Sequence, residues 1–150
     1  MSIQRILTPL SALAAGSLAL LALSSFRDAE AARADDALHE HMEAIENSVK
    51  RLRRSLRDPE QLPASLTLVG QMQADTLACK GEKPHAPENV TGEALEEYHT
   101  AYRRMMVDFL AAQLELEAAL LDGDKAKADA AFSKVRDFEE TGHERFTSDG

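Results

Sequence analysis

Apolar side chains recur at helical spacing in four segments of the chain. In residues 36–57, 91–121 and 125–146 they lie three or four positions apart, with charged side chains between them. Residues 63–80 carry a weaker stripe of the same kind. This spacing predicts four amphipathic helices, because it places the apolar residues on one side of a 3.6-residue turn. The stripes of the first, third and fourth segments are Leu38, Met42, Ile45, Val49, Leu52 and Leu56; Leu95, Tyr98, Tyr102, Met105, Phe109, Ala112, Leu116 and Ala119; and Ala128, Ala131, Val135, Phe138, Gly142 and Phe146.

Proline, glycine and capping residues separate the four segments. Pro59 stops the first helix and Gly81 ends the second, while residues 81–91, with two prolines, form an irregular connection. Gly123 ends the third helix and Asp124 caps the fourth. No helix buries its stripe alone. We therefore expect an all-α protein, an antiparallel up-down-up-down four-helix bundle.

Residues 1–34 have the composition of a secretory signal peptide. Arg5 precedes an uncharged run, residues 6–26, and Ala32-Arg33-Ala34 matches an Ala-x-Ala cleavage site. We expect cleavage after Ala34 and export to the periplasm, which leaves residues 35–150 as the bundle domain. The alternative is an uncleaved anchor, because an uncharged run of 21 residues is long enough to span a bilayer.

Composition narrows the classes of function. The 150 residues carry 17 Lys and Arg against 26 Asp and Glu, a formal net charge of −9, and cleavage after Ala34 would make it −10. Such an acidic chain is a poor partner for nucleic acid and favours proteins with basic docking faces. The single cysteine, Cys79, excludes an internal disulfide and a cysteine-based zinc or iron–sulfur site.

One end of the predicted bundle gathers the residues with distinctive chemistry. In this topology the start of the first helix, the end of the second, the start of the third and the end of the fourth lie together. Four of the six aromatic residues that follow residue 34 are expected there. The residues expected at this end are Met42, Thr76, Cys79, Tyr98, Tyr102, Phe138, His143 and Phe146.

Met42 and His143 lie on helices that are neighbours in this topology, with axes about 8–10 Å apart. A thioether and an imidazole pointing inward would bracket a flat metal macrocycle, and Gly142 would leave room for its edge. Iron held in this way has no open position for substrate, so it suits electron transfer rather than catalysis. The same residues also fit ordinary roles, Met42 as a core gap-filler and His143 as a solvated side chain near a helix end.

Several stretches resemble the cytochrome b562 family, periplasmic four-helix proteins that carry non-covalent haem b. LHEHME at residues 38–43 resembles the start of the mature family chain, and Tyr98 and Tyr102 match the position and spacing of two core aromatics there. Residues 123–146 look alignable to the last family helix without a gap. The resemblance covers nearly all of the chain after residue 34, at low identity and without a single diagnostic motif.

The resemblance implies an electron carrier that binds haem b and is not an enzyme. The axial ligands of the haem iron in that family are a Met early in the first helix and a His late in the fourth, which correspond here to Met42 and His143. The chain would be a monomer or weak dimer that meets redox partner proteins through its acidic surface. The residues expected around the ring are the aromatic wall and two leucines at the outer edge: Tyr98, Tyr102, Phe138, Phe146, Leu38 and Leu95.

Two features differ from the family pattern. The chain is about one turn longer between the first two helices and within the third, which preserves the buried face because a turn is 3.6 residues. Glu139 stands one turn before His143, where the family example has an arginine near the haem propionates. Lys80, Lys83 or Arg145 would have to offset this acid.

A haem-free bundle that serves as an interaction module or a copper buffer is the alternative. His39, His41 and Met42 are a compact set of residue types that bind copper. On a helix, however, His39 and His41 point about 200° apart, at about 100° per residue. A copper site would instead combine His39 and Met42 with a residue of a neighbouring helix such as His143. The remaining two histidines are expected on the surface.

Overall fold

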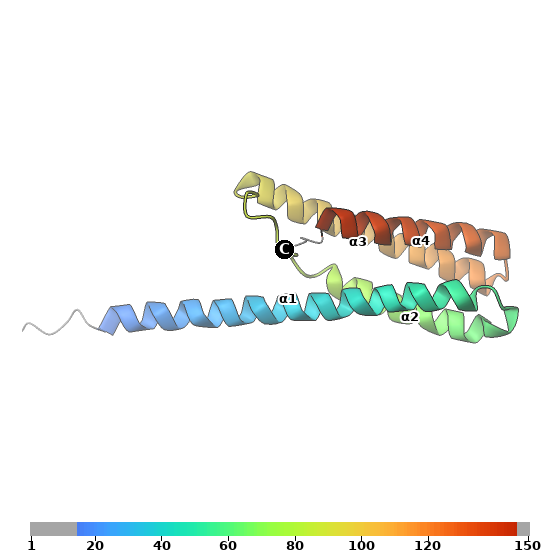
Figure 1. Cartoon of the computed structure of the whole chain (residues 1–150), viewed down its shortest axis with the longest axis horizontal. Helices are drawn as coiled ribbons and strands as arrows, with labels where there is room; N and C mark the ends of the chain where they lie inside the picture. Colours follow the sequence, from blue (N-terminus) through green and yellow to red (C-terminus); the bar gives the residue numbers. More distant parts are fainter. Residues whose placement is uncertain (1–14, 147–150) are drawn as a thin grey trace, which may run out of the picture. The chain divides into compact units, whose positions relative to one another are not determined.

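The protein is all-α. The computed structural model describes residues 15–146, with the side chains of Arg33 and of residues 35–146 (Figure 1). Within these residues, four α-helices follow one another without a β-strand: α1 (Ala15–Ser55), α2 (Leu62–Cys79), α3 (Glu93–Leu121) and α4 (Lys125–Phe146). A short 3-10 helix, η1 (Pro59–Gln61), precedes α2. The all-α prediction is therefore confirmed.

The helix α1 begins much earlier than the sequence pattern predicted. It starts at Ala15 rather than near Asp36, because the intervening residues are rich in good helix formers and contain no proline. The chain divides into two units, residues 1–33 and 34–150, and the site described below lies within the second. The start of the predicted signal peptide lies outside the described residues, so cleavage after Ala34 stays a prediction.

The possibility of a membrane anchor concerns the same segment. In the part of the chain that the structure describes, no helix combines the length and apolarity needed to cross a membrane. The predicted run of residues 6–26 begins outside that part, and its side chains are not among those described.

Hydrogen bonds show the relative direction of α1 and α2. His41 Nδ1 lies 2.8 Å from the Oδ1 atom of Asp75, near the end of α2. At the other end of the pair, Ser65 Oγ donates to Ser55 Oγ at 2.8 Å. Because the later residue of α1 meets the earlier residue of α2, the two helices run antiparallel. The connection between them is held by the Asp58 carboxylate, which accepts a hydrogen bond of 3.0 Å from a backbone N–H of η1.

The helices α2 and α3 are also antiparallel. Gln73 Nε2 donates to Glu117 at 2.8 Å, and Gln113 Nε2 donates to Thr76 Oγ1 at 2.8 Å.

Between α3 and α4 the chain reverses within three residues. Gly123 takes a φ of +69° there, a left-handed conformation that favours glycine after a helix end. Figure 1 shows α3 and α4 side by side beyond this turn.

One cluster of buried apolar side chains joins the helices. The predicted stripes of α1, α3 and α4 are buried or pack against this cluster, apart from Leu95. The weak stripe of α2 was predicted less well, because Ser65 and Leu68 are buried as well. The spacing had placed inward Leu66, Val69, Met72 or Gln73, Thr76, and Cys79 or Lys80. The fully buried members include Val49, Leu52, Val69, Met72, Tyr102, Met106, Leu116 and Val135.

Candidate functional site

A cavity of about 510 Å³ lies at one end of the bundle, between α1, α3, α4 and the connection from α2 to α3. We call this end the open end and the space the open-end cavity. Its volume falls in the range of about 300–1,000 Å³ that is usual for small-molecule and cofactor sites. It is lined by Asp35, Asp36, Leu38, His39, Met42, Glu43, Glu46, Pro84, His85, Tyr102, Met105, Gly142, His143 and Phe146.

Met42 and His143 face this cavity from two different helices. Met42 lies on α1 and is half-buried, whereas His143 lies in the last turn of α4 and is exposed. Both side chains also line a small inner cavity of about 10 Å³, deeper in the bundle. A thioether and an imidazole therefore share one space between neighbouring helices.

A backbone carbonyl holds the imidazole of His143. Its Nδ1 atom lies 3.1 Å from the carbonyl oxygen of Glu139, one turn earlier on α4. Because a carbonyl oxygen only accepts hydrogen bonds, Nδ1 carries the proton and the neutral ring keeps its lone pair on Nε2. Histidines that bind metals are commonly oriented in this way, with the second ring nitrogen donating to a carbonyl or carboxylate.

Gly142 brings α4 close to α3 beside His143. A Cβ atom at this position would lie 3.0 Å from Met105 Cε and 3.7 Å from Met105 Sδ. The thioether of Met105 thus packs directly on the helix backbone at Gly142. Met105 is 9% exposed and lines both the open-end cavity and the inner cavity.

Aromatic rings form part of the wall. Tyr102 and Phe146 line the open-end cavity, and their ring centroids lie 5.3 Å apart in an edge-to-face arrangement. Phe138 lines the inner cavity instead, next to Phe109 at 6.2 Å. Leu38 also lines the open-end cavity. Three of the predicted wall residues therefore face this cavity and a fourth lies below it.

The other two predicted wall residues lie elsewhere. Tyr98 supports the wall from behind, because its ring packs on Phe146 at 5.2 Å while its hydroxyl reaches the α2–α3 connection. Leu95 is not among the residues that line the open-end cavity or the inner cavity. It stands only one turn into α3, before the helix reaches the cavity.

Three side chains of α3 hold the last residue of α2 and the α2–α3 connection, residues 80–92, in place beside the cavity. Tyr98 donates to the carbonyl of His85 at 3.3 Å, and Tyr102 donates to the carbonyl of Cys79 at 3.2 Å. His99 Nε2 lies 3.3 Å from the carbonyl oxygen of Pro84. His99 was expected on the surface, but this contact half-buries it and leaves its Nδ1 atom buried without a hydrogen-bond partner.

The mouth of the cavity is acidic. Four carboxylates line it, together with three imidazoles: Asp35, Asp36, Glu43 and Glu46, with His39, His85 and His143. The hydrogen bond from Lys50 lowers the pKa of Glu46, so this carboxylate is ionised at neutral pH. None of the three basic residues expected to offset the acids belongs to the lining residues described here. Of these three, Arg145 places its guanidinium over the ring of Phe146, 5.2 Å from the centroid.

Glu139, the acid that differs from the family pattern, lines the inner cavity rather than the mouth. Burial raises the pKa of Glu139, and the nearby Glu46 carboxylate raises it further, whereas His143, Arg53 and Lys50 oppose this change. The carboxyl therefore gives up its proton less readily than an exposed glutamate does.

The cavity offers fewer suitable ligands for a bare metal ion than for a metal macrocycle. His39, Met42 and His143 all line the open-end cavity. Within the described part of the chain, however, no group of three or more His, Cys, Asp or Glu side chains is close enough to hold a metal ion. His41 is turned away from the cavity toward Asp75 on α2.

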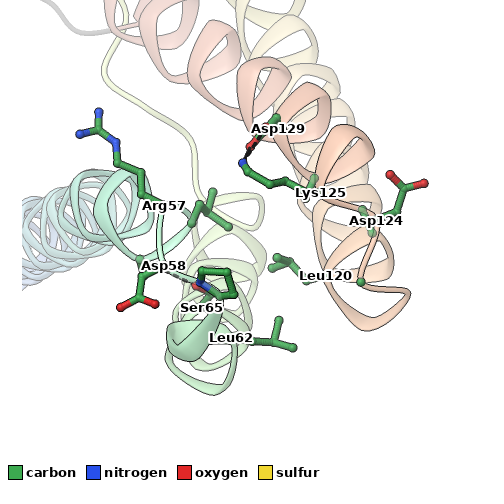
Figure 2. A pocket seen from close by; sticks show the side chains of 14 residues that line it. Arg57, Asp58, Leu62, Ser65, Leu120, Asp124, Lys125 and Asp129 are labelled. Carbon is green, nitrogen blue, oxygen red and sulfur yellow. Dashed lines mark hydrogen bonds and ion pairs between the residues drawn. The ribbon is translucent and has the colours of Figure 1, made fainter.

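A second pocket, of about 240 Å³, lies at the opposite end of the bundle, which we call the turn end. Figure 2 shows Leu62 and Leu120 pointing into it, with Lys125 paired to Asp129 at its edge. Its lining is mostly apolar. No Met, His or Cys is among the described residues around it.

Comparison with known proteins does not identify the chain. No protein family, no curated protein and no solved structure matches it.

Proposed function

We propose that this protein binds one haem b in the open-end cavity, through Met42 Sδ and His143 Nε2, and carries electrons between redox partner proteins in the periplasm. The observation that supports this most directly is that the two side chains face one cavity from neighbouring helices. The resemblance to the cytochrome b562 family points to the same two positions.

The residues around the cavity fit such a group. A thioether and a neutral imidazole are established haem ligands, and the Glu139 carbonyl already orients His143 with Nε2 available. Gly142 adds no side chain of its own to the cavity, but Met105 packs on it in this structure, so a flat ring would reach the backbone of α4 there only after the Met105 thioether moves. Tyr102 and Phe146 offer apolar faces to a ring.

Haem iron held by Met and His exchanges one electron at a raised potential. The protein's own residues would bind the haem and shield it from water. Leu38, Tyr102 and Phe146 exclude water from one side of the cavity, and the connection tied down by Tyr98 and His99 covers another. The proposal needs no general acid, base or nucleophile, which agrees with the prediction that the protein is not an enzyme.

The acidic mouth defines the kind of partner. Asp35, Asp36 and Glu43 are exposed at the cavity through which electrons would pass. A redox partner with a basic docking face would be attracted there, and association would weaken as salt screens the charges. Raising ionic strength from about 0.01 M to about 0.15 M shortens the screening length from about 30 Å to about 8 Å, so the association rate should fall steeply.

A hemin titration tests the ligand assignment. The purified protein should bind one equivalent and give a sharp Soret band, with an α-band after reduction. Met42→Leu keeps the bulk but removes the sulfur, and His143→Gln removes the imidazole, so both should weaken hemin binding by about tenfold or more. His41→Gln is the matched control, because this histidine pairs with Asp75 outside the cavity and its loss should change nothing.

Two results would overturn the assignment. Wild-type protein could leave only the spectrum of free hemin, or both ligand variants could bind hemin as wild type does. The copper alternative remains distinct, since His39, Met42 and His143 share the cavity. It predicts copper binding that is lost in His39→Ala and is indifferent to hemin.

Export is tested on the protein as the cell makes it. Full-length protein expressed in a bacterium should appear in the periplasmic fraction with Asp35 as its first residue. If it stays in the membrane fraction with an intact N-terminus, residues 6–26 serve as an anchor and the bundle is tethered.

A further inference from the structure

We infer that Met105 is a movable floor of the open-end cavity, and that it sets how deeply and how fast a porphyrin enters. This inference rests on the proposed function, because it concerns the same cavity. It assigns a role to a residue of α3 that is neither an axial ligand nor part of the predicted aromatic wall.

Met105 lies where several spaces in and on the bundle meet. Three separate spaces meet at this side chain: the open-end cavity, the inner cavity, and a groove of about 550 Å³ on the outer side of α3 and α4. The open-end and inner cavities also share Met42, Gly142 and His143 as lining residues. Met105 is therefore one of the residues that border both of these spaces, and of those residues it alone also lines the outer groove.

The contact with Gly142 shows where the floor rests. Met105 Cε lies 3.0 Å from the point where a Cβ on Gly142 would be, so the side chain covers the backbone that a ring edge would otherwise approach. A planar ligand that reaches the level of Gly142 must displace this methyl group. Leu38, Tyr102 and Phe146, by contrast, stand on the walls of the same cavity.

The Met105 side chain also has free space beside it for another rotamer. Methionine is unbranched and has three rotatable side-chain bonds, so it changes rotamer more easily than leucine or an aromatic residue. The α3–α4 groove, which Met105 lines and His143 does not, offers space for this side chain. Rotation toward the groove would join the open-end cavity to the inner cavity without moving a helix.

Metal-free protoporphyrin IX is the probe that separates this role from iron ligation. Its association with the full protein can be followed by stopped-flow fluorescence, and it makes no bond to Met42 or His143. Met105→Ala removes the floor and should speed association by about tenfold, whereas Met105→Leu keeps the bulk, loses flexibility and should slow it by about threefold. Met72→Leu makes the same change at a fully buried position outside the cavity and should leave the rate unchanged.

Gly142→Ala tests the same contact by adding a methyl group instead of removing side-chain atoms. The new Cβ would press on the flexible end of Met105, which can yield, and alanine favours the helix, so the melting temperature of the protein should stay the same or rise. The same Cβ would narrow the cavity and weaken porphyrin binding by about tenfold. A rise in stability together with a loss of affinity is not expected from a purely structural glycine.

The outcomes separate the two proposals. If wild type and the Met105 variants bind neither protoporphyrin IX nor hemin, the proposed function is wrong. If wild type binds both, but all Met105 and Gly142 variants associate within about twofold of it, the floor assignment alone is wrong.

Discussion

The two ends of the bundle differ in what their side chains do. At the open end, a cavity of about 510 Å³ is lined by carboxylates, imidazoles, thioethers and aromatic rings, under a connection of more than ten residues. At the turn end, a pocket of about 240 Å³ is mostly apolar, and short turns close both helix pairs. Those turns are held by hydrogen bonds that the Asp58 and Asp124 carboxylates accept and by one that Ser65 Oγ donates.

This difference suggests a division of labour, in which the turn end provides stability and the open end provides the binding site. The turn end fixes the register of the helices through caps and close packing, whereas the open end keeps space and unusual chemistry. A protein that only needed to be stable would gain from filling the open end, since cavities cost contacts. Predictions that treat the two ends separately can therefore test whether stability and function are located apart.

The largest expected effect comes from truncating the packed core toward the turn end. Leu52 is fully buried on α1, so Leu52→Ala should lower the free energy of unfolding by about 2–5 kcal/mol. Met42→Ala removes a side chain of similar size that already borders a cavity, and without added hemin it should cost about 1 kcal/mol or less. Urea unfolding of both variants, followed by circular dichroism, measures the difference.

Equal losses of stability in Leu52→Ala and Met42→Ala would contradict the division of labour. The open end would then be as tightly packed as the turn end, and the cavity beside Met42 would not persist in solution.

The helices themselves were largely predictable from the sequence. The three–four spacing places α3 and α4 within a few residues of their observed bounds, because apolar periodicity and the Gly123 turn are local properties of the chain. The start of α1 was not predicted, because the apolar three–four spacing begins only at Leu38, whereas the helix continues back to Ala15 without a proline to interrupt it. The weak stripe of α2 left its buried face uncertain, and the structure places Leu68 there.

The candidate site was predictable only in part. The topology brings Met42 and His143 to one end, and that follows from counting helices. The contact between Met105 and Gly142 does not follow from spacing, because it depends on how far each helix is rotated about its own axis. The half-burial of His99 likewise depends on the path of the α2–α3 connection, which has no periodic pattern.

An intermediate effect is expected from pH at the open end. Burial raises the pKa of Cys79 from 9.0 to about 12, and the carboxylate of Asp75 adds to this shift. Above about pH 9 the unfolded chain loses the thiol proton while the folded protein keeps it, so stability falls as pH rises through this range. The fall approaches about 1.4 kcal/mol per pH unit for one such group.

Cys79→Ala isolates this contribution. The substitution lowers stability at every pH because it leaves a small cavity, but its stability should fall less steeply than that of wild type between about pH 9 and about pH 11. Burial also raises the pKa of Tyr102, so some slope remains in the variant. Parallel curves for wild type and Cys79→Ala would show that the thiol is not protected from solvent at this end.

The smallest effect is expected at the turn end, where Asp124 caps α4. Its carboxylate accepts a hydrogen bond of 3.0 Å from the backbone N–H of Lys127 and lies 3.1 Å from the ammonium of the same residue. The backbone hydrogen bond is the main cause that lowers the pKa of Asp124 below 3.8. The cap therefore contributes its full stabilisation at pH values above 3.8, the ordinary pKa of this group. The contribution is lost as the pH falls through the lowered pKa of the folded protein.

Two substitutions divide this effect between hydrogen bond and charge. Asp124→Asn keeps an acceptor oxygen, so near neutral pH its melting temperature should stay close to that of wild type, whereas Asp124→Ala should melt lower. Both variants should also lose less stability than wild type on acidification, because neither titrates. If Asp124→Asn instead melts as low as Asp124→Ala, the negative charge at the start of α4 matters more than the hydrogen bond. The turn end would then be held by electrostatics, and high salt should weaken it while leaving the packed core unchanged.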